Sequence, residues 1–128
     1  MKGKQKFFIC KRCGNLVGMI NDKGRPLTCC GEAMTELVPN TAEAAQEKHL
    51  PVISVFEDSI TVQVGSVPHP MTEEHHIAFV YVETERGGQR KCLKAGEEPK
   101  VTFNLSGDKP VAVYAYCNLH GLWKTEVE

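Results

Sequence analysis

The chain has 128 residues, which is room for one compact domain or for one domain with a small appendage. Its 15 basic and 16 acidic side chains leave a formal net charge of -1, which argues against a nucleic-acid-binding protein, since such proteins normally carry a basic stripe. The sequence has no apolar run of about 18 residues that could cross a membrane, and too few apolar residues precede Cys10 for a signal peptide. We therefore expect a cytoplasmic protein, whose six cysteines are metal ligands or catalytic thiols rather than disulfides.

Four of the six cysteines lie within the first 30 residues, where we predict a small module over residues 1–37. Short β-rich runs occupy residues 6–10, 16–20 and 34–38, and residues 21–24 between the second run and the next cysteines predict a hairpin loop. Domains below about 40 residues usually need a metal, disulfides or association, because they bury too little apolar surface. The first module is therefore expected to be knotted around a metal ion.

Residues 38–48 are predicted to form a linker, because Pro39 and Asn40 interrupt the pattern. Thr41 can cap a helix, and the good helix formers that follow it up to Lys48 predict about two helical turns. From residue 50 onward apolar residues recur with a period of two in five runs, and two further runs bring the prediction to about seven strands. The expected strands span residues 52–56, 60–64, 77–81, 89–93, 101–105, 111–115 and 122–127. This spacing is typical of an immunoglobulin-like antiparallel β-sandwich over residues 49–128, so the fold class is mainly β.

The first cluster of candidate ligands consists of the C-x-x-C pair Cys10 and Cys13 and, after 15 intervening residues, the adjacent pair Cys29 and Cys30. Four thiolates make a tetrahedral site that suits zinc or iron, and a glycine after each pair eases the turn around the ion. A thioredoxin-like redox pair is the alternative, but the βαβ pattern that it needs does not surround Cys13. Both metals stay open, and the adjacent second pair, which differs from the usual zinc ribbon, favours iron.

The second cluster combines Cys117 with five histidines at strand ends or in loops, where binding residues are commonly held: His49, His69, His75, His76 and His120. Imidazole suits zinc, copper, iron or nickel, and Cys117 and His120 are close enough along the chain to chelate one ion. Adjacent side chains of a strand point to opposite faces. His75 shares its parity with Ile77, Phe79 and Tyr81, the stronger apolar set, so we expect His75 to be a ligand and His76 not.

The sequence resembles the desulfoferrodoxins, the two-iron superoxide reductases of anaerobic prokaryotes, over essentially the whole chain. The two cysteine pairs with their glycines look like the desulforedoxin-type amino-terminal module, and residues 47–52, 65–71, 74–75 and 116–124 look like the catalytic module. The resemblance implies one iron bound by Cys10, Cys13, Cys29 and Cys30. It implies a second iron with an equatorial square of histidines and an axial cysteine, formed by His49, His69, His75, His120 and Cys117.

The function implied is that of a superoxide reductase, an oxidoreductase of detoxification and oxidative stress. Five ligands leave the sixth position of the iron open, where ferrous iron gives one electron to superoxide and two protons release hydrogen peroxide without dioxygen. A donor such as rubredoxin then restores the ferrous state. Lys48, next to ligand His49, is expected to attract the anion and organise proton-donating water, and Glu47 resembles the carboxylate that occupies the open position of oxidised iron. The family resemblance also implies a homodimer.

Other functions stay open on the sequence alone. A non-enzymatic iron electron carrier, a zinc-stabilised binding module and a superoxide dismutase differ from the reductase in metal content, redox spectra or dioxygen release. The first iron either relays electrons or only stabilises its module. Cys92 matches no family ligand, and we expect it to be a small buried hydrophobe.

Overall fold

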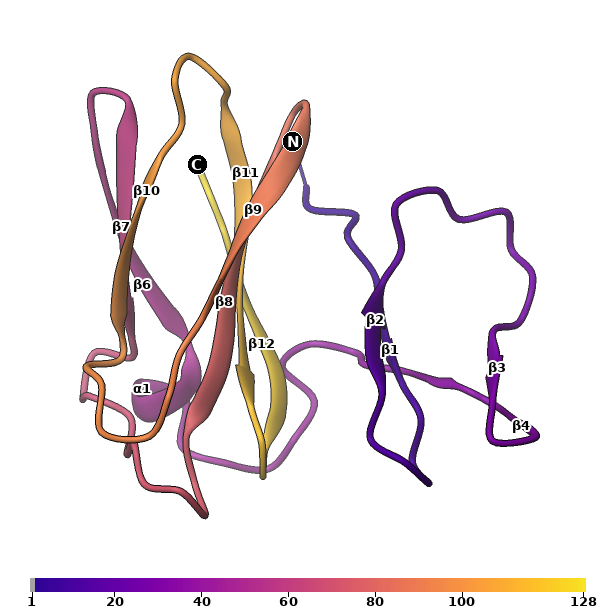
Figure 1. Ribbon diagram of the computed structural model, residues 1–128. Helices are drawn as coiled ribbons and strands as arrows, with labels where there is room; N and C mark the ends of the chain where they lie inside the picture. Colours follow the sequence, from indigo (N-terminus) through magenta and orange to yellow (C-terminus); the bar gives the residue numbers. More distant parts are fainter. Residues whose placement is uncertain (1) are drawn as a thin grey trace. The chain divides into compact units, whose positions relative to one another are not determined.

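A computed structural model describes residues 2–128, so Met1, with which the predicted first module begins, lies outside the described residues. The chain divides into two compact units, Lys4–Val38 and a larger unit of Pro39–Glu128 that also includes Gly3. Both units are built from short antiparallel strands (Figure 1), which confirms the mainly β fold class. None of the helices within residues 2–128 has the length and apolar character needed to span a membrane.

The smaller unit contains two small sheets. One has the strand order β2-β1-β5, and in the other β3 pairs with β4. The strands are β1 (Phe7–Ile9), β2 (Leu16–Gly18), β3 (Thr28–Cys29), β4 (Glu32–Ala33) and β5 (Thr35–Glu36). The predicted hairpin at residues 21–24 is wrong, because β2 pairs with β1 and β3 with β4. Residues 21–24 instead form a local turn within the connection between the sheets, where the Asp22 carboxylate accepts the Gly24 N–H at 2.8 Å.

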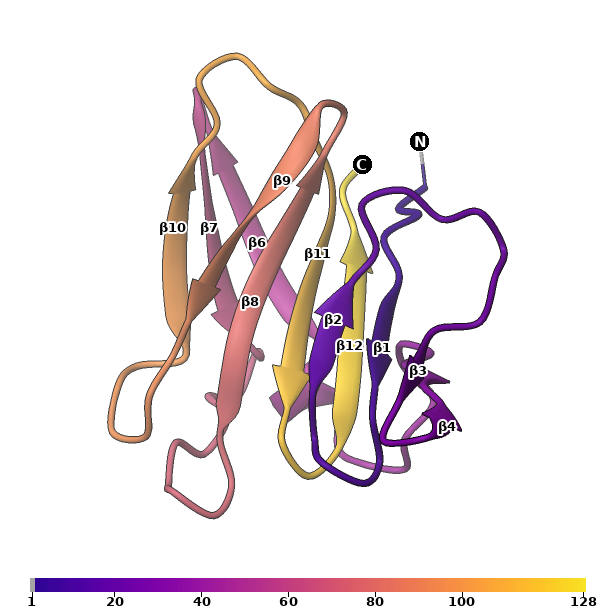
Figure 2. The ribbon, with the colours of Figure 1, turned by 45° about the vertical axis from the view of Figure 1, so that its right-hand side comes forward.

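The larger unit is a sandwich of two antiparallel sheets, which Figures 1 and 2 show from two directions. One sheet has the order β10-β7-β6 and the other β12-β11-β8-β9. The strands are β6 (Pro51–Phe56), β7 (Ser59–Val64), β8 (Ile77–Thr84), β9 (Gly87–Cys92), β10 (Lys100–Asn104), β11 (Pro110–Cys117) and β12 (Gly121–Glu126). Alternate residues of β7 and β10 point inward, as the period of two predicts, and pack with β8 and β11 into one core that includes Ile60, Phe103 and Cys117.

The pairing of β8 with β11 is irregular at the end nearest the histidines. Phe79 lies opposite Tyr116, but the next pair joins Ile77 to Cys117, so one residue of β8 is skipped. Because of this irregularity Ile77 faces the core, whereas Phe79 stacks on Tyr116 with ring centroids 5.6 Å apart on the opposite face. The predicted apolar set of Ile77, Phe79 and Tyr81 on one face is therefore wrong beyond Ile77.

The helix α1 (Gln46–His49) is shorter than the predicted two turns. Residues 41–45 are not helical, and Ala45, which precedes the helix, has an extended backbone (φ -65°, ψ 117°) without a side-chain cap. Contacts with the sandwich hold α1 in place, since the Val67 N–H donates to the Glu47 carbonyl at 2.8 Å. The predicted second turn over residues 41–45 is wrong, because helix propensity is a weak preference that did not decide the structure there.

Cys92 is exposed at the end of β9, so the prediction of a buried hydrophobe is wrong. The strand β9 is an edge of its sheet and all six of its residues are exposed. A period-two pattern does not distinguish an edge strand from a central one, because the order of strands is a property of the folded sheet.

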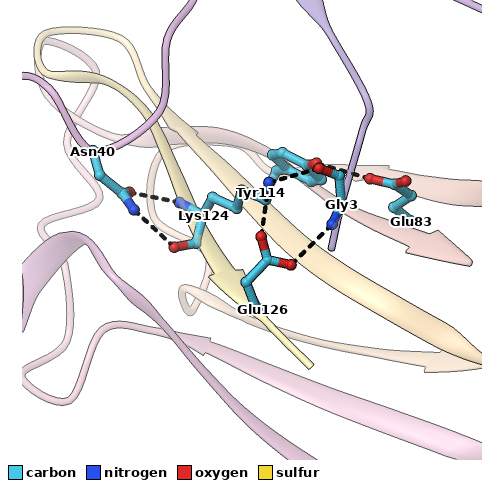
Figure 3. Close-up of polar contacts among 6 residues, drawn as sticks. All are labelled: Gly3, Asn40, Glu83, Tyr114, Lys124 and Glu126. Carbon is cyan, nitrogen blue, oxygen red and sulfur yellow. Dashed lines mark hydrogen bonds and ion pairs between the residues drawn. The ribbon is translucent and has the colours of Figure 1, made fainter. Parts of the chain in front are cut away.

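Residues of β12 bind Gly3 and Asn40, which belong to the larger unit and lie next to the two ends of the smaller unit in the sequence (Figure 3). The Lys124 ammonium donates to the Gly3 carbonyl at 2.9 Å and pairs with Glu126 at 2.9 Å, and Glu126 accepts the Gly3 N–H at 2.9 Å. The backbone of Lys124 exchanges two hydrogen bonds with the Asn40 side chain, at 2.8 and 3.1 Å. Gly3 packs so closely that a Cβ would lie 2.7 Å from the Tyr114 hydroxyl, which leaves no room for a side chain.

Candidate metal centres

Two hairpin turns of the smaller unit bring four cysteines together; we call this group the cysteine site. Cys10 and Cys13 lie at the turn between β1 and β2, and Cys29 and Cys30 at the turn between β3 and β4. Their sulfur atoms all lie within 4.8 Å of one another. The glycine after each pair has a positive φ, +84° and +75°, which supports the role that the sequence assigned to these glycines.

The thiols of the cysteine site are too close to ionise together. Hydrogen bonds from the backbone N–H of Cys13 and, to a lesser extent, of Arg12 lower the pKa of Cys10 to about 7. Hydrogen bonds with the side chains of Cys13 and Cys10 raise the pKa of Cys30 to about 12. A bound cation removes this conflict, because it stabilises every thiolate at once. The donor set therefore fits a thiophilic metal.

Three segments of the larger unit bring the histidines together at one end of the sandwich, where α1, the start of β8 and the β11–β12 turn lie (Figure 1). His49 ends α1, His69 and His75 lie between β7 and β8, and Cys117 and His120 bound the β11–β12 turn. Candidate donor atoms of His49, His69, His75 and Cys117 lie within 4.8 Å of one another. The Nδ1 of His120 lies 3.2 Å from His49 Nε2 and 3.9 Å from Cys117 Sγ. We call these five residues the histidine site.

The four imidazoles form a closed square. Neighbouring rings around it meet nearly at right angles, with centroids 4.6 Å (His49–His69), 4.7 Å (His69–His75), 5.0 Å (His75–His120) and 5.0 Å (His120–His49) apart. The diagonal pair His49 and His75 lies 6.3 Å apart. His76 is not part of the square, and its Nδ1 lies 3.1 Å from the Thr72 carbonyl oxygen.

Hydrogen bonds on the outer side of the square determine which ring nitrogens face its centre. The Nδ1 atoms of His49 and His69 each donate to a backbone carbonyl, of Ala45 and Pro70, both at 2.7 Å, so each Nε2 faces inward. Within residues 2–128 the buried Nε2 of His75 has no hydrogen-bond partner. A buried polar atom without a partner is unfavourable unless something binds it, and a metal ion at the centre satisfies this requirement.

Burial keeps the site in the protonation state in which imidazole binds metals. His49 and His69 are only 2% and 3% exposed, and burial lowers the pKa of both, that of His69 to about 4. Burial lowers the pKa of His75 as well, and it raises the pKa of the Cys117 thiol, against the backbone N–H groups of Leu119 and His120. The neutral imidazoles and the Cys117 thiolate would hold a metal ion in the square.

Trp123, to which the sequence alone assigned no role, supports the square through two of its histidines. Its ring stacks on His49 at 4.9 Å with an interplanar angle of 29°, and its Nε1–H donates to the His120 carbonyl at 3.1 Å. Its place in the sequence, three residues after His120 and as the single tryptophan of the chain, is the signal that could have indicated this role.

Lys48 and Glu47 lie on α1 directly before His49, and both are exposed. The positive charge of Lys48 contributes to the lowered pKa of His49 and of His75, after burial and the other histidines, so its field reaches the site. The Glu47 backbone carbonyl is held by the Val67 N–H and by the Ser66 hydroxyl, at 2.8 and 3.2 Å. These bonds tie α1 to the loop that leads to His69.

Comparison with known proteins identifies the family. A family model described as Desulfoferrodoxin matches residues 41–126. The desulfoferrodoxin of Syntrophotalea carbinolica is 42% identical over 126 residues, which cover 98% of this chain and 99% of that protein. The chain belongs to the desulfoferrodoxin family. The cysteine site and the histidine site match the two iron sites of desulfoferrodoxins, so the donor sets of both fit iron.

Solved structures extend the comparison to the fold. The crystal structure of the superoxide reductase from Treponema pallidum has a TM-score of 0.81 and 39% identity, and the match covers 97% of this chain and all of that chain. The one-iron superoxide reductase from Giardia intestinalis has a TM-score of 0.56 and 30% identity over 64% of this chain and 98% of its own. A superoxide reductase of Pyrococcus horikoshii is 39% identical over 101 residues, or 64% of this chain and 87% of that protein.

Proposed function

We propose that this chain is a superoxide reductase, which reduces superoxide to hydrogen peroxide by one electron at the histidine site and releases no dioxygen. The square of four imidazoles beside Cys117, with His49 and His69 buried, is the observation that carries this proposal. Relatives and structural neighbours named superoxide reductases, from Pyrococcus horikoshii and Treponema pallidum, support the same activity.

The proposed ligands are Nε2 of His49, His69 and His75, Nδ1 of His120 and Sγ of Cys117. Ferrous iron in this site supplies the electron that superoxide receives. Five protein ligands leave one of the six positions of an iron ion for the substrate. His49, His69 and His75 remain neutral at physiological pH because burial lowers their pKa values, so these three can hold the iron without competing protons.

Lys48 and Glu47 are the proposed residues that act on substrate and on the open position. The exposed Lys48 ammonium attracts the superoxide anion and orients water that donates protons, and focusing of this kind raises association rates by about 10- to 10³-fold. The Glu47 carboxylate is proposed to occupy the open position of the oxidised site when superoxide is absent. Lys48→Ile should slow the reaction with superoxide and weaken its dependence on ionic strength. Rates in pulse radiolysis equal to those of the native protein would contradict this role.

We propose that residues 1–37 are a desulforedoxin-like module, residues 38–48 a linker and residues 49–128 the catalytic domain. Among the described residues of the smaller unit, Phe7 and Cys10 are the buried apolar ones, which supports a stabilising role for the metal of the cysteine site. Cys13→Ser separates stabilisation from electron relay. If the iron only stabilises, the variant melts earlier but forms peroxide at the native rate when the histidine site is reduced chemically. If the iron also relays electrons, turnover with a rubredoxin-like donor falls as well.

Metal analysis combined with visible spectra of the oxidised and reduced protein tests the proposed function directly. Two irons per chain, with thiolate charge-transfer bands that appear in separate oxidation steps, are expected. Zinc in the histidine site would exclude the reductase and favour a zinc-stabilised module. Dioxygen released during the reaction with superoxide would favour a dismutase. We further propose that the protein acts in a reducing cytoplasm, where its thiols persist as ligands, and as a homodimer, which sedimentation equilibrium would test.

A further inference from the structure

Asn118 connects the β11–β12 turn, which carries Cys117 and His120, to the segment before β8 that carries His75. It follows Cys117 in the β11–β12 turn, and its side-chain oxygen accepts the backbone N–H of His76 at 2.9 Å. Its side-chain nitrogen donates to the Glu74 carbonyl at 3.0 Å, and its own backbone N–H donates to the His76 carbonyl at 3.2 Å. All three bonds therefore end on the two residues that flank His75.

This connection lies where the regular pairing of the strands stops. The ladder between β8 and β11 is irregular between Tyr116 and Cys117, and β8 begins only at Ile77. The spacing between the Cys117 turn and the His75 segment is thus not set by a continuing sheet. The amide of Asn118 replaces the missing ladder, because it offers one acceptor and one donor to the two neighbouring backbone groups.

His75 depends on its backbone for its position more than two of the other histidines do. His49 and His69 are oriented by their own Nδ1 bonds to backbone carbonyls, at 2.7 Å each. The inward Nε2 of His75 has no hydrogen-bond partner among residues 2–128, and the backbone of His75 is held by Thr72, which accepts its N–H at 3.1 Å. Asn118 fixes the residues on either side.

We propose that Asn118 is a positioning residue of the histidine site, which sets the distance between Cys117 with His120 on one side and His75 on the other. An asparagine suits this role because a carboxylate lacks the donor for the Glu74 carbonyl and alanine lacks both groups. The proposal rests on the iron site itself and not on superoxide reduction, so a measurement of metal binding tests it separately from the proposed activity.

The test compares Asn118→Ala, Asn118→Asp and Asn118→Gln in the full chain, with Asn104→Ala as the matched control. Asn104 is an exposed asparagine of β10 whose side-chain oxygen accepts only local bonds from Ser106, at 3.2 Å. The readouts are the affinity of the histidine site for ferrous iron in competition with a chelator, and the position of the Cys117 thiolate-to-iron band in the oxidised protein. Far-ultraviolet circular dichroism, to which the seven strands of the larger unit contribute most, serves as the control for folding.

Asn118→Ala should bind ferrous iron about 10- to 100-fold more weakly and shift the Cys117 band, as expected for loss of a group that supports metal ligands. Asn118→Asp keeps the acceptor for His76 and should lose less affinity, and Asn118→Gln should recover part of it. Native affinity and an unshifted band in Asn118→Ala would overturn the proposal. So would a loss of affinity with an unshifted band in the folded Asp variant, since that result assigns Asn118 a merely structural role.

Discussion

Gly65 follows β7, and its replacement by alanine should impair the histidine site without changing a ligand. A Cβ at this position would lie 2.6 Å from the Glu47 carbonyl oxygen and 2.9 Å from the Lys48 carbonyl carbon. Ordinary van der Waals contact begins at 3.4 Å, so the backbone of α1 must retreat by about 0.8 Å, the difference between the two distances. These atoms belong to the backbone, and no side-chain rotation can relieve the overlap.

The retreat displaces all of α1, which has four residues and carries Glu47, Lys48 and His49. Overpacking of this kind costs about 1–3 kcal/mol of unfolding free energy. A misplacement of about 1 Å can slow a reaction by about 10²-fold, so we expect Gly65→Ala to react with superoxide about 10- to 100-fold more slowly.

Pulse radiolysis of the iron-loaded protein measures this rate, and iron analysis shows whether His49 still holds its metal. Ser66→Ala is the matched control: it removes the exposed bond between the Ser66 hydroxyl and the Glu47 carbonyl, 3.2 Å long, and adds no atom. Its rate should stay near that of the native protein. A Gly65→Ala variant with full iron content and the native rate would show that the reaction does not depend on the position of α1. This result would refute the reasoning.

Three further predictions concern the surroundings of the sites. Trp123→Phe keeps a ring against His49 but removes the Nε1–H bond to the His120 carbonyl, and calorimetry should show a loss of about 1 kcal/mol; an unchanged melting temperature would contradict the supporting role. In metal-free protein the pKa of His69 is lowered from 6.5 to about 4, so the unfolded chain binds more protons between these values; stability is complete above pH 6.5 and falls by about 3 kcal/mol as the pH drops to 4. Urea unfolding across this range measures the effect, and a flat profile would argue against it. Lys124→Met keeps the aliphatic stem but removes the bond to the Gly3 carbonyl, so the Gly3 amide should exchange its hydrogen faster; native protection would show that Glu126 holds Gly3 alone.

Much of the architecture could be predicted from local patterns. The period of two predicted five of the seven strands of the sandwich because alternate residues of a half-buried strand face the core. The glycines after the cysteine pairs predicted tight turns, which is where their positive φ angles lie. Predictions failed where local preference did not decide the structure, as for residues 41–45, which favour a helix but are not helical. The hairpin at residues 21–24 failed for the same reason, since the strands on either side pair with other strands.

The sequence by itself determined the kinds of ligand and the order in which the chain supplies them. The choice of His75 rested on its parity with Ile77, Phe79 and Tyr81, but the irregular pairing moves Phe79 and Tyr81 to the other face, so that reasoning holds for Ile77 alone. The tertiary structure alone decided that His49 meets His69, 20 positions away, and His120, 71 positions away, and which nitrogen of each ring faces the centre. The physical reason is that a ring nitrogen is aimed by the partner of the other nitrogen and by the turn that carries it. Those partners, like the amide of Asn118 between two turns, come together only when the sheets have paired.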